Sequence, residues 1–268
     1  MTYKPSEELF VNKVRKAVFL FLFVLVFPVT VRSQGYAGDA ATSEPLMIID
    51  KPTAGMLKRG EFELTSNFYE QGGILVGINV GVFDQFSFGV SYGGTDIIGS
   101  SRIGWNPEPG VNARFRIINE NFVMPAIALG FDSQGKEPFL DADSLRRYTI
   151  KSPGFFAAAS KNYSILGNLS IHGGLNMTLE RHDGDKDLDA YVGGEKSIGR
   201  DISLFGEYDF GFNDDQTIGR GRGYLNLSLR WSWGKGLVVG FDLKNVTKNQ
   251  QNISIGTRTI EIDYVGEF

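Results

Sequence analysis

Ser170 and His172 are the first residues whose types and spacing could do chemistry together. A serine hydroxyl becomes a nucleophile when a histidine accepts its proton, and a third group must orient that histidine. Residues i and i+2 of a strand point to the same side, so the two side chains would share one face. No carboxylate stands at a spacing that identifies it as the third member. We therefore interpret His172 as a hydrogen-bonding residue inside the protein and prefer this to a hydrolase site.

Two further runs resemble ligand-binding loops. The run 182–189 reads HDGDKDLD, but a calcium loop needs a turn glycine where Leu188 stands, and no bidentate glutamate closes it. We expect a solvated external loop there, with a weak contact to a divalent cation as the alternative. The run 193–197, GGEKS, lacks the Gly-Lys dipeptide and the following helix of a phosphate loop. We predict no enzyme activity, no catalytic residue, no metal site and no cofactor.

Composition narrows the class of protein further. The chain has 268 residues, 34 glycines, 13% aromatic residues, no cysteine and a net charge of −4. A mean hydropathy of −0.12 does not suit a helical membrane protein. Without cysteine there are no disulfides, no thiolate sites and no N-terminal lipoprotein anchor. The mild charge provides no basic patch, so nucleic acid is not an expected partner.

The N-terminus carries the features of a secretory signal. Lys13, Arg15 and Lys16 precede an apolar run at 17–29, which is shorter than the ~20 residues needed to span a bilayer. We expect cleavage between Ser33 and Gln34. The predicted divisions are therefore a signal peptide at 1–33, an irregular N-terminal periplasmic segment at 34–59 and a barrel at 60–268.

From Gly60 onward the chain alternates apolar and polar residues in segments bounded by turn residues. This period of two predicts strands with one apolar and one polar face. We count about twelve strands, an even number, as bacterial outer-membrane barrels have. The fold class predicted is an all-β antiparallel transmembrane β-barrel, with strands at 61–68, 74–80, 86–92, 113–117, 123–131, 148–160, 169–179, 188–196, 202–212, 225–233, 237–243 and 256–268.

The connections between these segments alternate in length. Short connections are expected at 83–84, 120–121, 161–164, 198–200 and 234–235. Longer connections are expected at 95–109, 132–147, 181–187, 213–221 and 247–254, and the exception is the short first loop at 70–72. Short periplasmic turns and longer external loops are typical of an outer-membrane barrel and not of a Greek-key sandwich.

The last segment, GTRTIEIDYVGEF at 256–268, alternates strictly and ends on an aromatic residue. It is similar to the C-terminal assembly signal of outer-membrane barrels, and the resemblance implies that Tyr264 and Phe268 are read by the barrel-assembly machinery. We expect both to face lipid, and Trp231 and Trp233 to lie at the membrane interface. The predicted location is the bacterial outer membrane, with its lipid and lipopolysaccharide as partners.

The polar face of the strands carries charges of both signs. Interior charges in a narrow barrel usually pair and plug it, and only a minority line a conducting path. We expect a lumen network or path, and carboxylates on neighbouring or opposite walls as the partners of the arginines. Its predicted members are Glu61, Glu63, Arg114, Arg116, Glu207, Asp209, Arg230, Asp242 and Lys244.

Several short motifs occur together in one order: Pro52-Thr53-Ala54 before Gly60-Glu61-Phe62, then Arg114 to Ile117, Pro125 to Gly130 and Ala159-Ser160-Lys161. In this order and spacing the chain resembles the YjbH family of exopolysaccharide-associated outer-membrane proteins. The resemblance implies a barrel that is an accessory or a conduit for surface polysaccharide production or export, with polysaccharide or its export proteins as partners. The alternatives are a small passive porin and a structural or adhesive barrel that acts through its external loops.

Overall fold

The computed structural model describes residues 37–39, 43–142, 144–251 and 258–268. The predicted signal peptide at 1–33 and the cleavage position between Ser33 and Gln34 lie outside these residues. Among the described residues, no helix is long and apolar enough to cross a membrane.

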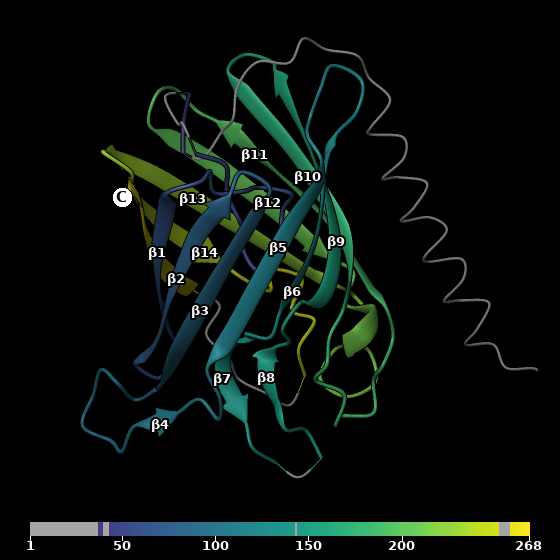
Figure 1. The fold of residues 1–268 in the computed structure, drawn as a ribbon. Helices are drawn as coiled ribbons and strands as arrows, with labels where there is room; N and C mark the ends of the chain where they lie inside the picture. The colour runs from purple at the N-terminus through teal and green to yellow at the C-terminus, as the bar shows by residue number, and fades with distance from the viewer. Residues whose placement is uncertain (1–36, 40–42, 143, 252–257) are drawn as a thin grey trace, which may run out of the picture.

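Twelve antiparallel strands close into a barrel (Figure 1), which confirms the predicted fold class. Each strand pairs with the next along the chain, and the last pairs with the first, with Leu64 opposite Tyr264. The barrel strands are β1 (Glu61–Tyr69), β2 (Gly73–Phe83), β3 (Phe86–Thr95), β5 (Gly110–Ile118), β6 (Ala126–Asp132), β9 (Gly154–Ser164), β10 (Asn168–Met177), β11 (Asp189–Ser197), β12 (Ile202–Asp209), β13 (Tyr224–Gly234), β14 (Leu237–Leu243) and β15 (Arg258–Glu267).

Three short strands and one short helix lie in the loops. The two-residue β4 (Gly104–Trp105) extends the sheet beside β3, and β7 (Lys136–Leu140) pairs with β8 (Arg147–Ile150) in a separate hairpin. A 3-10 helix, η1 (Phe212–Asp214), follows β12. None of these elements belongs to the closed wall.

The two faces of each wall strand differ as the alternation predicts. In β13, Leu229 and Trp231 are each 41% exposed, whereas Ser228 and Arg230, which alternate with them, are buried. The outer face is therefore apolar and the lumen face polar, which is the reverse of a water-soluble barrel. Such an exterior is stable against hydrocarbon, because a closed barrel leaves no unpaired strand edge there.

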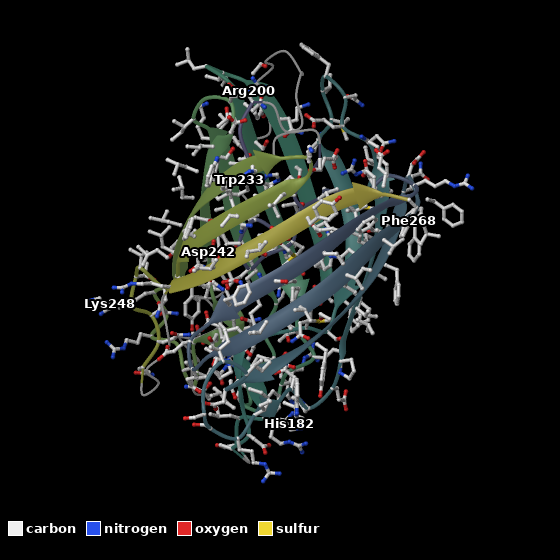
Figure 2. All side chains as sticks on the ribbon, turned by 90° about the vertical axis from the view of Figure 1, so that its left-hand side faces the viewer. His182, Arg200, Trp233, Asp242, Lys248 and Phe268 are labelled. Carbon is white, nitrogen blue, oxygen red and sulfur yellow. The ribbon has the colours of Figure 1, made fainter. Side chains whose placement is uncertain are left out.

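The connections also follow the predicted pattern, with short turns at one end of the barrel and longer loops at the other. Figure 2 places Arg200, in a short turn, and His182, in a long loop, at opposite ends of the molecule. β1 begins and β15 ends at the short-turn end. By the topology of bacterial barrels, the short-turn end faces the periplasm and the long-loop end faces outward.

Three predicted strands have clearly different bounds in the structure. The segment 148–160, predicted as one strand, is divided between β8 and β9 at Pro153 and Gly154. Proline donates no ladder hydrogen bond, and Gly154 has a φ of 64°, so a continuous strand is interrupted there. Likewise, β6 begins only after Pro125, and β12 ends at Asp209, so that Phe212 lies buried in η1.

The N-terminal segment is the main difference from the prediction. Residues 43–57, called the plug below, lie inside the lumen and not in the periplasm, and Ile48, Ile49 and Ala54 are fully buried. The plug forms a hairpin with a bridge between Met47 and Pro52, and it joins β1 at the short-turn end. Eight strands enclose an interior that wall side chains alone fill, so a wider twelve-stranded barrel leaves room for a segment of chain.

Candidate functional site

The candidate site is the lumen, where polar wall residues hold the plug. Its tip, residues 49–51, directs three consecutive backbone N–H groups at one carboxylate oxygen of Glu207, at 3.0, 2.9 and 2.8 Å. Converging amides of this kind form an anion-binding concavity. The other oxygen of Glu207 accepts a hydrogen bond from Asn226. Glu207 thus fixes the conformation of the plug tip from the barrel wall.

The Lys51 side chain is buried between two strands. Its ammonium nitrogen lies 2.9 Å from an oxygen of Asp189 on β11 and 2.9 Å from an oxygen of Asp209 on β12. Burial alone would lower the pKa of Lys51, but the two carboxylates raise it above its ordinary value. Lys51 is therefore charged at any physiological pH and joins the plug to two wall strands.

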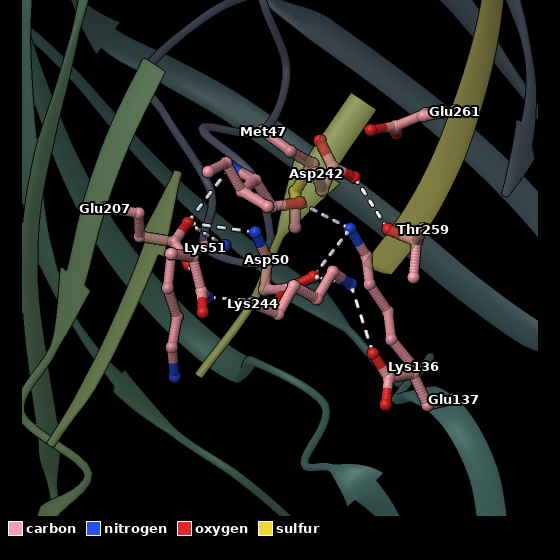
Figure 3. A network of polar contacts seen from close by, with 12 residues as sticks. Met47, Asp50, Lys51, Lys136, Glu137, Glu207, Asp242, Lys244, Thr259 and Glu261 are labelled. Atoms are coloured by element: carbon pink, nitrogen blue, oxygen red, sulfur yellow. Dashed lines mark hydrogen bonds and ion pairs between the residues drawn. The ribbon is translucent and has the colours of Figure 1, made fainter. Parts of the chain in front are cut away.

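Asp50 is the point at which the plug, the wall and the external hairpin meet (Figure 3). Its carboxylate lies 2.9 Å from the Lys244 nitrogen and 3.2 Å from the Lys136 nitrogen, the latter on β7. Burial would raise the pKa of Asp50, but the two lysines outweigh it and hold the pKa at about 2. Lys244 also lies 3.5 Å from Glu137 of the same hairpin. The external loop and the plug are thus joined through buried charges.

Arg114 and Arg116 on β5 hold both limbs of the plug, mainly through backbone oxygens. Arg114 donates to the carbonyls of Leu46 at 2.8 Å and Gly55 at 3.3 Å. Arg116 donates to the Ala54 carbonyl at 3.0 Å and forms an ion pair with Glu44. We expected wall carboxylates as the partners of these arginines, and that expectation is wrong. The plug supplies the acceptors because it lies between β5 and the opposite wall.

The other predicted lumen residues also face inward, but they bind wall or mouth residues. Arg230 on β13 forms ion pairs with Glu261 at 2.6 Å and Asp263 at 3.3 Å, both on β15, and lies 3.7 Å from Asp242 on β14. The structure thus brings the nine predicted residues into the lumen in three groups, which are the plug contacts, an Arg230 cluster, and two glutamates of β1. Of these two, Glu61 accepts from the backbone of Lys58 at 2.7 Å and Glu63 accepts from Asn79 at 3.0 Å.

The external loops are tied together by a second buried cluster. Arg147 on β8 is fully buried and binds Asp183, at 2.9 Å, and Asp214 of η1. Lys151 lies 2.7 Å from Asp183. Burial raises the pKa of Asp183, but Lys151 and Arg147 lower it below the ordinary value. The run 182–189 is therefore not the solvated loop that we expected, since its acids neutralise buried cations.

The structure offers no support for ion binding by this run. In the described part of the chain, no group of three or more acidic or histidine side chains could hold a metal ion. Asp185 accepts hydrogen bonds from the backbone of Asp187 and of Asp215. Its carboxylate thus organises the loop locally.

The histidine considered for catalysis has a different serine partner. The Nδ1 atom of His172 lies 2.8 Å from the hydroxyl of Ser160 on β9, whereas Ser170 donates to Asn162. The Ser160 hydroxyl also accepts from the backbone N–H of Ala54 in the plug, at 2.9 Å. This arrangement holds the plug against β9 and β10, and no carboxylate among the described residues orients the Nε2 atom of His172.

Two groups of exterior aromatic residues lie at strand ends beside short turns. The ring centroids of Trp231 and Trp233 lie 4.7 Å apart with the rings tilted, and Phe62 lies 6.0 Å from Tyr264 and 4.9 Å from Phe268. Phe268 is 85% exposed and Tyr264 is 40% exposed on the outer face. Both face lipid as the alternation requires, and their role as an assembly signal stays a prediction.

Several residues of the site were not predicted from the sequence. Asp50, Lys51, Lys136, Glu137 and Arg147 all bind in the lumen or beneath the loops, and each is nearly or fully buried. One signal was present for the first two, since Asp50-Lys51 follows Ile48-Ile49 and precedes a proline. A pair of opposite charges beside an apolar pair suits a buried hairpin tip better than a periplasmic tail.

Comparisons with known proteins bear on the fold alone. No family model matches the chain, and no curated protein matches it. Among solved structures, it is similar to the KdgM porin, with 10% identity and a TM-score of 0.45 over 76% of this chain and 98% of that chain. The KdgM porin in complex with disordered oligogalacturonate matches with a TM-score of 0.46, also at 10% identity and over the same shares of the two chains.

A third solved structure is the translocator domain of the autotransporter NalP from Neisseria meningitidis. It matches at 14% identity and a TM-score of 0.33 over 78% of this chain and 86% of that chain. The identities and scores are too low to argue for a shared function. The structure itself therefore defines this chain as a twelve-stranded membrane β-barrel whose lumen is occupied by its own N-terminal segment.

Proposed function

We propose that this protein is an outer-membrane β-barrel that acts as a gated accessory or conduit in the production or export of a surface polysaccharide. The apolar exterior, the loop pattern and the predicted signal peptide support the outer-membrane location. The resemblance to the YjbH family supports the link to polysaccharide. In the resting state the plug closes the lumen.

The single observation that carries the gated function is the way in which the plug is held. Beside an apolar cluster of Ile48 and Ile49 with wall side chains, it is bound by polar contacts, such as the three amides on Glu207 and the two ion pairs of Lys51. A polar interface between the plug and the wall can exchange its partners for water when the plug moves, whereas an apolar core cannot. The lumen of a barrel without its plug would be lined by hydroxyl, amide and charged groups, which suit a hydrated sugar chain.

A passive porin is the alternative, and the closed lumen does not favour it. A passive porin needs a continuous aqueous path, and here the plug runs between β5 and β12, where it contacts both walls. The adhesive alternative rests on free external loops, but the largest loop carries β7, whose Lys136 points inward to Asp50.

The test combines a genetic and an electrical measurement. Deletion of the gene should reduce surface polysaccharide, and the wild-type gene should restore it. Purified wild-type protein in a planar bilayer should be closed for most of the time, and a variant without residues 43–57 should conduct. Unchanged polysaccharide in the deletion strain would contradict the polysaccharide role, and a steadily open wild-type channel would favour the passive porin.

A further inference from the structure

A chamber remains in the outer half of the lumen between the plug and the wall formed by β1, β2, β3 and β5. Its cavity volume is about 100 Å³, and it is open to solvent on one side. Gly77 stands at a lumen-facing position of β2 and has no side chain to fill the chamber. It lies on the long-loop side, since Gln134 and Lys151 of the loop between β6 and β9 also line it.

Asn67 on β1 points into this chamber and carries the clearest sign of an unfilled binding capacity. The residue is 6% exposed, and neither its amide nitrogen nor its amide oxygen has a hydrogen-bond partner among the described residues. A buried amide without partners is costly, by about 1–3 kcal/mol. Because the amide offers both a donor and an acceptor, it suits a ligand group that is itself both, as a hydroxyl is.

The neighbouring lining continues this chemistry. Asn112 donates to Asn79 at 2.8 Å, and Asn79 donates to Glu63 at 3.0 Å, so that an amide row crosses from β5 to β1. The first bond passes over Gly89, where a Cβ atom would lie 2.0 Å from the Asn79 oxygen. Ser91 donates to Gln134 at 3.1 Å on the same side. Gly89 thus permits the hydrogen bond between Asn112 and Asn79, which a side chain at position 89 would block.

Three of the four cations that line the chamber form ion pairs within the protein. Lys136 pairs with Asp50, Lys151 with Asp183, and Arg230 with Glu261. Glu63 accepts from the Asn79 amide, and Asp132 accepts from the backbone of Gln134 at 2.9 Å. Arg114 also lines the chamber and donates to the plug carbonyls of Leu46 and Gly55. With this arginine the lining carries five carboxylates and four cations, so an anionic ligand would enter a site with an excess of negative charge. The remaining lining includes Leu46, Met47 and Leu75, which offer apolar surface to C–H groups.

We propose that this chamber binds a neutral saccharide, through amide hydrogen bonds centred on Asn67 and apolar contacts from the plug. This deepens the proposed function and rests on it for the source of the ligand, which would be a neutral unit of the surface polysaccharide. The plug supplies one wall of the chamber through Leu46 and Met47. Occupation of the chamber therefore favours the seated plug.

The test uses the full mature protein in detergent and isothermal titration calorimetry with two probes, cellobiose and the acidic disaccharide cellobiouronic acid. We expect cellobiose to bind in the millimolar range or tighter and the acidic probe to bind at least tenfold more weakly. Asn67→Leu should weaken cellobiose binding about tenfold, since it removes a ligand hydrogen bond in a buried site. Gly77→Val should weaken it further by filling the chamber, because a Cβ there meets only the movable Thr65 hydroxyl at 2.8 Å.

Asn168→Leu is the matched control. Asn168 is also 6% exposed and also carries an amide nitrogen without a partner among the described residues, but it lies at the short-turn end of β10, away from the chamber. Folding of each variant is verified by its heat-dependent shift in gel mobility. Equal loss of binding in Asn67→Leu and Asn168→Leu, preference for the acidic probe, or no binding by the wild type would each overturn the proposal.

The two proposals fail in different experiments. If deletion of the gene lowers surface polysaccharide but cellobiose does not bind, the saccharide chamber is refuted and the gated function stands. If cellobiose binds at Asn67 but deletion leaves the polysaccharide unchanged, the chamber stands and the polysaccharide role is refuted.

Discussion

Replacing Lys51 by methionine tests whether buried charges hold the plug. Methionine keeps an unbranched side chain but removes the ammonium group that lies 2.9 Å from both Asp189 and Asp209. The side chain of Lys51 is 4% exposed, and those of the two carboxylates are 0% and 11% exposed. The substitution therefore leaves two close carboxylates in the lumen without their cation, and neither can turn to solvent while the plug is seated.

The expected loss of free energy follows from the burial of the Lys51 ammonium group and its two carboxylates. Removing one member of a buried ion pair costs about 3–5 kcal/mol, because it leaves an uncompensated charge. The carboxylates regain water when the plug leaves, so this cost falls on the seated state. Each 1.4 kcal/mol corresponds to about a factor of ten, so the ratio of unseated to seated plug should rise between roughly 10²-fold and several thousand-fold. Lys51→Met should therefore change a mostly closed barrel into one that opens frequently.

Single-channel recording in planar bilayers measures this ratio as open probability. Lys58→Met is the matched control, since Lys58 follows the plug but has a side chain that is 62% exposed and an ion pair of 3.5 Å with Glu61. An exposed pair of this kind contributes about 0–1 kcal/mol, so the control should stay closed. Replacing Asp189 and Asp209 by asparagine in the Lys51→Met background should restore closure. An open probability equal to wild type in Lys51→Met, with normal folding, would refute the view that these charges seat the plug.

Three further predictions concern the wall, the C-terminus and the external hairpin. Arg114→Ala combined with Arg116→Ala leaves three plug carbonyls without their donors. The melting temperature of the double variant should therefore fall, and small solutes should leak through the barrel, when both are measured on the same purified protein. An unchanged melting temperature together with an unchanged leak would show that these contacts are not needed. Deletion of Phe268 or the change Tyr264→Asp should allow secretion but block insertion, which is measured as loss of the heat-dependent mobility shift. The aspartate places a charge on the lipid face, at a cost in stability of up to about 2–4 kcal/mol. Burial raises the pKa of Glu137 to about 7, from 4.5. This stabilisation of the docked hairpin is fully present below about pH 4.5 and is lost as the pH rises through about 7. The protection factors of the β7 and β8 amides, which are corrected for the intrinsic exchange rate at each pH, should therefore fall over that window in the wild type and stay constant in Glu137→Gln.

The barrel wall was predictable because its signal is local. Alternation along a strand follows from the period of two, and it requires only that one face meets lipid and the other does not. The inward direction of Arg230 and the outward direction of Trp231 could therefore be read from neighbouring residues alone. The exceptions are places where backbone chemistry interrupts a pattern, as Pro153 and Gly154 do between β8 and β9.

The chain by itself thus determined the strands, their faces, the two ends of the barrel and the set of charges that point inward. Only the tertiary structure decided what those charges bind. Glu207 and Asp50 are 157 positions apart, and Lys244 and Asp50 are 194 apart. Contacts at such separations leave no periodic trace in a single sequence, because they depend on which segment fills the lumen after the wall has closed. The composition of the segment before the first strand does not tell whether it lies in the periplasm or in the barrel. Its location in the lumen is decided by the buried partners that the closed wall supplies.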